Sequence, residues 1–327
     1  MSAWIGALAL AVWVGLGAAL LAGAAIGAVW RLGAERRASC PPRARTRAAE
    51  RHALAASAVP ALWLALCLLP GMLAWLGFSD HCTRHADHVH LCLAHPVPGL
   101  PAPLAWGALG IGGVAVLVAS RRAAPTLGDV AAWRRLDAAR RRGGGGFERA
   151  ASERPFSLVT GLWRPRIWIS DALWRDLGPA ERAVVLAHER AHVRRRDPLR
   201  RIAVVLLTLP APTRTRASIL RTWTLASEQL CDEIAAREVG DRLLVAGTIV
   251  AVARRIGGVA PPVSAPSFGG GDTEQRVRSL LADAPAPEGP PRRRTVLVLA
   301  ALGLAAAAAA PVHHVTEHLI DLLLHLG

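Results

Sequence analysis

Long apolar runs alternate with arginine-rich segments along this chain. Four runs predict membrane-spanning helices, namely Ala3–Trp30, His52–Phe78, Leu104–Ser120 and Thr295–Val312. Crossing a bilayer takes about 20 predominantly apolar residues, with a range of roughly 17–25, so the last two runs are near the short limit. A fifth apolar run, Ile202–Ala211, is shorter and predicts a buried or half-inserted helix instead of a span.

The arginines alternate between the two sides of these runs. Segment 31–51 is rich in arginine, segment 79–103 carries a single one, segment 121–294 both begins and ends with arginines, and segment 313–327 has none. Positively charged loops next to membrane spans stay in the cytosol. The pattern therefore predicts a multi-pass protein of the bacterial inner (cell) membrane. Its N-terminus and tail lie outside, and its two basic segments lie in the cytosol.

Composition agrees with a membrane protein that has a water-facing part. Of the 327 residues, 52% are hydrophobic and 19% are charged, against about 25% charged in a typical soluble domain. This excludes a disordered chain, a disulfide-stapled miniprotein and an ordinary cytosolic enzyme. The net charge is +15, and every positive side chain is an arginine. Arginines beside apolar spans set topology, so we expect contact with membrane lipid and no direct binding of nucleic acid.

The fold class that follows is mainly α, a multi-pass protein with about four transmembrane helices. We expect three spans with a basic cytosolic loop (31–51) and a His/Cys-rich outer loop (79–103) in 1–120, a cytosolic domain in 121–256, a Gly/Pro-rich linker in 257–294, a fourth span in 295–312 and a short outer tail in 313–327. Within the cytosolic domain, Phe156–Ile169 is β-branched and aromatic around Gly161, which predicts a small β-hairpin. A short helix, Thr273–Ala282, is predicted inside the linker.

The most informative segment is a His-Glu-x-x-His motif, which comprises His188, Glu189 and His192. On a helix, residues at i and i+4 lie one turn apart on the same face, so both imidazoles can hold one Zn²⁺ ion. The glutamate beside the first histidine then lies next to the open position of the metal, where it can act as catalytic base. The alternative, a charged and solvated helix face, fits poorly with the apolar run Val184–Ala187 that leads into the motif.

The third metal ligand has to be a carboxylate. No histidine lies between His95 and His188, or between His192 and His313, and the outer histidines belong to the other side of the membrane by the predicted topology. The candidates are Asp197, Glu228, Asp232, Glu233 and Glu238. Glu228 and Asp232 share one face of a predicted helix, so one can bind zinc while the other accepts the free N–H of a ligand histidine.

Three patterns together resemble the BlaR/MecR-type membrane metallopeptidases. These are Gly161 with Arg164–Ile167, the His188–His192 motif with Arg194 and Asp197, and Glu228 with Cys231 and Asp232. The resemblance implies a cytosolic, helical, gluzincin-like zinc-protease domain with His188, His192 and Glu228 as zinc ligands and Glu189 as catalytic base. In the best-known members an outer sensor domain detects β-lactams, and the protease inactivates a cytosolic transcriptional repressor. Only His313–Gly327 follow the last run here, so we expect no penicillin-binding domain.

The leading prediction is a membrane zinc endopeptidase that cuts a cytosolic protein, a transcriptional repressor in a signalling pathway. One alternative is a non-catalytic membrane sensor of the same fold, although a decayed site should lose Glu189 first. Another is a metal-handling membrane protein, suggested by the five histidines of the outer loop. In that loop, Cys82 and Cys92 form a disulfide, part of a metal site or neither, and we expect the loop to receive the signal.

Overall fold

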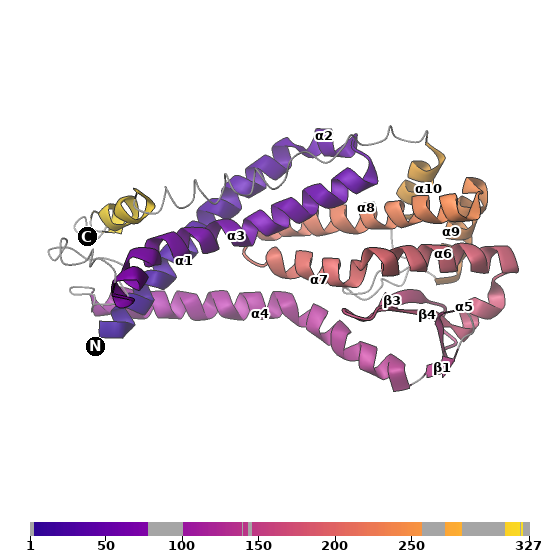
Figure 1. The fold of residues 1–327 in the computed structure, drawn as a ribbon, viewed down its shortest axis with the longest axis horizontal. Coiled ribbons are helices and arrows are strands. Elements are labelled where there is room, and N and C mark those ends of the chain that lie inside the picture. The colour runs from indigo at the N-terminus through magenta and orange to yellow at the C-terminus, as the bar shows by residue number, and fades with distance from the viewer. Residues whose placement is uncertain are drawn as a thin grey trace.

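Three long helices dominate one end of the molecule (Figure 1). The computed structural model describes residues 3–77, 101–138, 140–142, 146–256, 272–282, 311–320 and 322. The long helices are α1 (Ala3–Leu32), α3 (Pro42–Trp75) and α4 (Ala102–Ala138), and the short α2 (Ala34–Ala38) joins the first two. Each holds a stretch long and apolar enough to cross a membrane, at Ile5–Leu32, Pro42–Leu69 and Ala102–Ala132. The first three predicted spans are thus confirmed as helices of sufficient length and apolarity, whereas Thr295–Val312 lies outside the described residues except for its last two.

Two of these helices extend beyond the apolar runs that predicted them. α3 begins at Pro42, inside the segment expected to be a basic loop, and α4 continues past Ser120 to Ala138. Both extensions are rich in alanine and arginine, which are strong helix formers, so hydrophobicity alone underestimated the helices. Pro125 lies inside α4, and Figure 1 shows that this helix bends along its length, as expected where proline removes a helical hydrogen bond.

The other end of the molecule combines helices with a small sheet (Figure 1). Its helices are α5 (Asp171–Asp176), α6 (Pro179–Arg195), α7 (Asp197–Leu207), α8 (Thr213–Val239), α9 (Arg242–Ile256) and α10 (Thr273–Leu281). α10 confirms the short helix predicted in the linker. The predicted buried helix Ile202–Ala211 corresponds to α7, which starts earlier, at Asp197. α7 is not among the helices long enough to span a membrane.

The sheet has four strands in the order β1-β2-β4-β3. The predicted hairpin is confirmed as the antiparallel pair β3 (Ser157–Thr160) and β4 (Arg166–Ser170). In its turn Gly161 has φ 93°, and a Cβ there would lie 2.5 Å from the Arg164 carbonyl oxygen, so only glycine fits. β1 (Arg140–Arg142) and β2 (Glu148–Ala150) were not predicted; β2 pairs antiparallel with β1 and parallel with β4.

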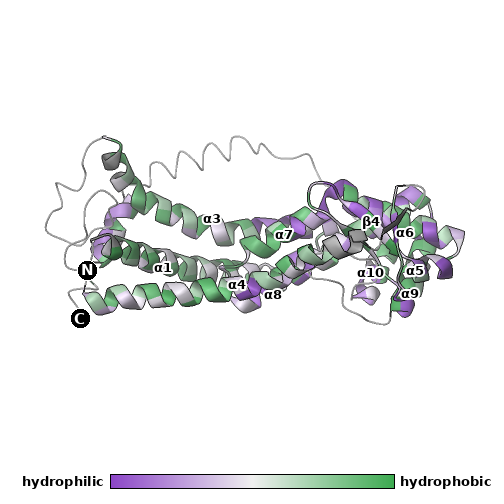
Figure 2. Cartoon of the chain, turned by 90° about the horizontal axis from the view of Figure 1, so that it is seen from below, coloured by the Kyte–Doolittle hydropathy of each residue, from purple (hydrophilic) through white to green (hydrophobic). Residues whose placement is uncertain are grey.

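The core of this end lies between the sheet and the helices α6, α8 and α9. It includes Val159, Ile169, Val185 and Ile249, all 1% exposed or less. α8 contacts both α6 and the membrane helix α3, so it connects the two ends of the molecule. Coloured by hydropathy, the long helices are mostly green towards the end that carries both termini, and purple residues gather towards the end that carries α5, α6 and α9 (Figure 2).

The predicted outer loop falls mostly outside the described residues, which leave out 78–100. Cys82 and Cys92 therefore lie outside the described residues. Residues 311–320, which comprise the end of the predicted fourth span and the start of the tail, are helical. Val312 and Ile320 pack against an apolar cluster that includes Leu10 of α1.

Candidate metal centre

α6 carries the His-Glu-x-x-His motif on a face that is fully buried. The helix begins after Gly178, whose backbone N–H donates to the Glu181 carboxylate at 2.9 Å, and Pro179 occupies its first turn, a position that tolerates proline. His188, Glu189 and His192 are all 0% exposed. The motif is therefore not a solvated helix face, as the apolar residues preceding it indicated.

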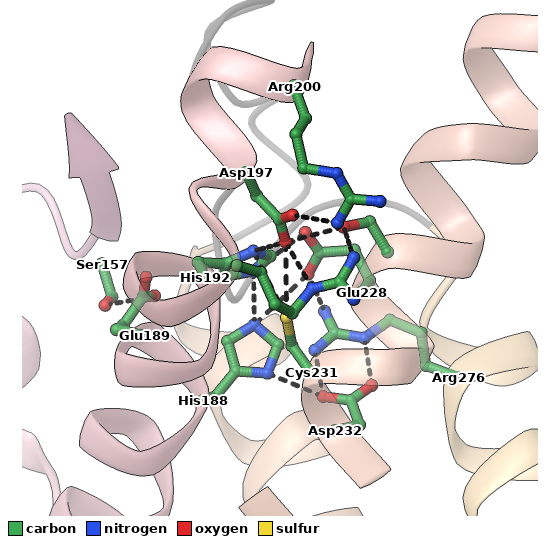
Figure 3. Close-up of polar contacts among 12 residues, drawn as sticks. Ser157, His188, Glu189, His192, Asp197, Arg200, Glu228, Cys231, Asp232 and Arg276 are labelled. Carbon is green, nitrogen blue, oxygen red and sulfur yellow. Dashed lines mark hydrogen bonds and ion pairs between the residues drawn. The ribbon is translucent and has the colours of Figure 1, made fainter. Parts of the chain in front are cut away.

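Three side chains bring ligand atoms together at the centre of the site (Figure 3). The Nε2 atoms of His188 and His192 lie 3.0 Å apart. Glu228 of α8 places one carboxylate oxygen near each nitrogen: Oε2 lies 3.5 Å from His188 Nε2, and Oε1 lies 3.5 Å from His192 Nε2. Two atoms that each lie about 2.0–2.1 Å from one zinc ion are separated by at most about 4.2 Å. The three donors therefore fit a single metal ion, and they are one of the groups able to hold one among the described residues.

The second ring nitrogen of each histidine faces a carboxylate. His188 Nδ1 lies 2.9 Å from Asp232 Oδ1, and His192 Nδ1 lies 2.9 Å from Asp197 Oδ2. Each Nδ1 can therefore carry the proton and donate it, which leaves the lone pair on Nε2, where the metal would bind. The pairing of Asp232 with a ligand histidine was one of the predicted alternatives.

Asp197 lies against Nδ1 of His192, on the far side of the ring from Glu228. The sequence had offered it as a possible third ligand. Arg196, between α6 and α7, adopts a left-handed conformation with φ 54°, and this turn brings Asp197 back towards the helix that it follows. The neighbouring Cys231 Sγ lies 3.4 Å from His192 Nδ1. Burial raises the pKa of the Cys231 thiol to about 11, so this thiol is protonated at neutral pH.

The remaining candidate carboxylates lie away from the ligand atoms. Glu238 is on the surface, where it pairs with Arg194 at 2.9 Å and with Arg190 at 3.7 Å. Glu233 belongs to neither group of metal-capable side chains among the described residues. The second such group, His192, Asp197 and Cys231, includes the Nδ1 side of the same histidine ring.

Arg276 of α10 is a site residue that sequence reasoning missed. It is 1% exposed. Its Nη2 and Nε donate to Asp232 at 2.7 and 2.8 Å, and its Nη1 lies 3.3 Å from Glu228 Oε2. Burial alone would raise the pKa of Glu228, but Arg276 and the two histidines hold it well below its ordinary value. The only signal in the sequence was that Arg276 shares a helix face with Leu280, which is also buried.

Glu189 lies beside the ligands with one carboxylate oxygen available. Its Oε1 accepts a hydrogen bond from Ser157 Oγ of β3 at 2.7 Å. Its Oε2 is buried and has no hydrogen-bond partner among the described residues. Burial raises the pKa of Glu189, although the charges of the two histidines oppose this. A carboxylate in this environment can take up a proton from water held between it and the metal ligands.

Part of the site lies in a segment that matches a known protein family. Residues 115–209 match the family model described as BlaR1 peptidase M56, which takes in α6 and both histidines. This segment of the chain is therefore similar to M56 peptidases. This confirms the resemblance to the BlaR/MecR-type membrane metallopeptidases. Together with the three apolar helices, the family match indicates a membrane metallopeptidase of the sensor-transducer kind. Glu228, Asp232 and Arg276 follow the matched M56 segment, and no curated protein matches the chain.

Proposed function

We propose that this chain is a zinc metalloendopeptidase of the bacterial cell membrane that cuts a cytosolic protein. The observation that carries the proposal is the convergence of His188 Nε2, His192 Nε2 and the Glu228 carboxylate. Glu189 follows His188 on the same helix, and its buried Oε2 lacks a hydrogen-bond partner among the described residues. Two imidazoles and one carboxylate around an open position are the ligand set of many catalytic zinc sites. A non-catalytic relative would have no need of a correctly placed Glu189.

Each residue has a distinct part in this proposal. Zinc, when bound, supplies Lewis acidity that polarises a peptide carbonyl and makes water more acidic. Glu189 Oε2 accepts the proton of the attacking water and returns it to the departing amine. Ser157 fixes the other oxygen of the same carboxylate. Asp232 and Asp197 hold the two imidazoles so that their Nε2 lone pairs point to one place.

The ligand set can be tested with the full chain purified in detergent. Glu189→Gln should keep one zinc per chain but lose cleavage of denatured casein, because an amide cannot take the proton. His188→Ala, His192→Ala and Glu228→Ala should lose both zinc and cleavage. Glu238→Gln, an exposed carboxylate of the same helix as Glu228, serves as the matched control and should change neither. Full zinc occupancy in Glu228→Ala would refute the assignment of the third ligand.

The active site is proposed to face the cytosol, with the N-terminus outside. Support comes from the arginine asymmetry along the chain and from α2 and the basic start of α3, which lie towards the part of the molecule that holds the metal centre (Figure 1). Reporter fusions after Arg43 and after Asp272 should report the cytosol. Fusions after Asp87 and after Gly327 should report the outside. A fusion after Asp272 that reported the outside would contradict the proposal.

The substrate is proposed to be a transcriptional repressor. Support comes from the resemblance to BlaR/MecR-type proteins, in which the protease inactivates such a repressor. A DNA-binding repressor encoded beside this gene is the substrate to test first. Incubation with the zinc-loaded chain should produce discrete fragments, and Glu189→Gln should produce none. An intact repressor after incubation with a chain that cuts casein would contradict this substrate but not the peptidase activity.

A further inference from the structure

A continuous series of polar contacts leads from the membrane helix α3 to a ligand histidine. His192 Nδ1 lies 2.9 Å from Asp197 Oδ2. The other oxygen of Asp197, Oδ1, accepts from Arg200 Nη1 of α7 at 3.1 Å. The same guanidinium donates through Nε and Nη2 to Glu50 Oε1 of α3, at 2.9 and 2.6 Å. Figure 3 shows Arg200 reaching from its helix towards Asp197.

Glu50 contacts two of the helices that build the site, α7 through Arg200 and α8 through Trp223. Its Oε1 also accepts a hydrogen bond at 3.0 Å from Trp223 Nε1 of α8. Trp223 is 1% exposed and packs in a cluster with Ala49 and Ala53 of α3, which lie one residue before and three residues after Glu50. Glu50 lies within the candidate membrane span of α3, Pro42–Leu69. Glu50 therefore belongs to a candidate membrane helix and is fixed in place by two helices of the metal centre.

The two carboxylate oxygens of Asp197 have different partners, and this explains why Glu50 should affect the orientation of His192. Oδ2 accepts from His192 and also from Arg195 and Ser227, at 3.0 and 2.9 Å, whereas Oδ1 accepts from Arg200. The rotation of the carboxylate, and with it the direction of the hydrogen bond to the ring, depends on where Arg200 lies. A guanidinium has a rigid fork of donors, so a carboxylate that holds one side of the fork orients the other.

We propose that Glu50 of α3 is a positioning residue of the metal centre, acting on the ligand His192 through Arg200 and Asp197. This rests on the proposed metal site, and it adds a role for the membrane part of the chain. Carboxylates that hold ligand histidines set the orientation of the ring and the strength of metal binding. A displacement of α3 at Glu50 therefore reaches His192 through three side chains.

The test is Glu50→Gln in the full chain, which keeps the shape of the side chain and removes its charge. Zinc affinity is measured by competition with a chelator, and the ligand geometry is followed by the visible spectrum of the cobalt-loaded protein. Loss of a residue that contacts a ligand histidine costs about 10–100-fold in metal affinity. Glu50 acts two contacts further away, through Arg200 and Asp197, so a loss of roughly three- to tenfold and a shifted cobalt spectrum are expected. Glu238→Gln, which makes the same charge change at the surface, should leave both unchanged.

A purely structural role for Glu50 predicts a different result. The Glu50 and Arg200 side chains are each 29% exposed, and partly exposed ion pairs contribute little to stability. If Glu50→Gln lowered only the unfolding temperature, with the zinc affinity and the cobalt spectrum unchanged, the pair would be a helix–helix contact and the proposal would be overturned.

A double-mutant cycle shows whether the effect of Glu50 on zinc affinity passes through Arg200. If Glu50 acts through Arg200, then Arg200→Gln and the double variant should bind zinc equally weakly, because the second change removes nothing more. Additive losses would overturn the proposal. Failure of the proposed function would give a different result. If the unsubstituted (parent) chain binds zinc but cuts no protein, the peptidase activity is contradicted, whereas the zinc affinities of the variants still decide the role of Glu50. A parent chain that bound neither zinc nor cobalt would overturn both.

Discussion

Replacing Arg276 by alanine would leave two buried carboxylates without their shared counter-ion. The guanidinium is fully buried and lies 2.7 Å from Asp232 and 3.3 Å from Glu228. Removing one partner of a buried ion pair costs about 3–5 kcal/mol, because the other partner remains buried and charged. For a domain of 150–250 residues, 1 kcal/mol corresponds to roughly 2–4 °C in unfolding temperature, so a decrease of roughly 6–20 °C is expected in the metal-free chain.

The same helix provides a matched control for this substitution. Arg278 lies two residues further along α10, where its side chain is 75% exposed and pairs with Glu274 at 2.5 Å. Exposed pairs of this kind contribute little, so Arg278→Ala should shift the unfolding temperature by no more than about 2 °C. Thermal unfolding of both variants in detergent, with and without zinc, gives the comparison directly.

Zinc should change the result for Arg276→Ala in a defined way. A bound cation partly replaces the lost guanidinium at Glu228 but not at Asp232, so saturating zinc should recover part of the loss. If Arg276→Ala unfolded at the same temperature as Arg278→Ala in metal-free protein, the carboxylates would not depend on Arg276. The reasoning from burial would then be refuted.

Three further outcomes follow from the geometry of the site. Arg196→Gly should raise the unfolding temperature by about 2–4 °C, because glycine adopts the left-handed conformation without the cost of about 1 kcal/mol that other residues incur. Ser157→Ala should keep zinc but lower the casein cleavage rate about tenfold, because Glu189 loses a hydrogen bond worth about 1.5 kcal/mol. Burial alone would raise the pKa of Asp232, but Arg276 holds it below its ordinary value. Its stabilisation is therefore present above that ordinary value and lost as the pH falls, so Asp232→Asn should flatten the decrease in unfolding temperature between about pH 5 and pH 3.

The parts of the site that depend on a single helix could be predicted from the sequence. His188 and His192 lie on one face because their spacing is one helical turn, and the same holds for Glu228 and Asp232 on α8. The structure brings all four side chains together. Glu228 lies at the two Nε2 atoms and Asp232 at a ring Nδ1. Which of the two carboxylates would face the metal was indicated only by the family resemblance.

The parts that depend on turns and on distant segments could not be predicted. The position of Asp197 depends on the left-handed turn at Arg196, a conformation that no feature of an arginine signals. Arg276 is separated from Asp232 by 44 residues, and the Gly/Pro-rich surroundings of α10 indicated a linker. Its burial results from packing against α8 and α9, which no local pattern in α10 specifies. The lengths of α3 and α4 were underestimated for a different reason: their extensions lack an apolar run, although their alanines and arginines favour a helix.

The membrane helix α3 reaches the metal centre from two sides. On one side Glu50 contacts Arg200, and through it Asp197 and His192. On the other side Arg45 donates to Gln229 of α8 at 2.5 Å. The Gln229 amide in turn donates at 3.0 Å to a backbone carbonyl of α10, the helix that presents an arginine to the two carboxylates of the site. Because both routes start within two turns of one helix, a rotation of α3 would act on the histidine side and the carboxylate side together.

For comparison, α1 contacts α8 through a tryptophan hydrogen bond to Ser218 at 2.9 Å, further from the ligands along α8. Among these contacts, those of α3 offer the more direct mechanical path from the membrane to the proposed zinc ligands.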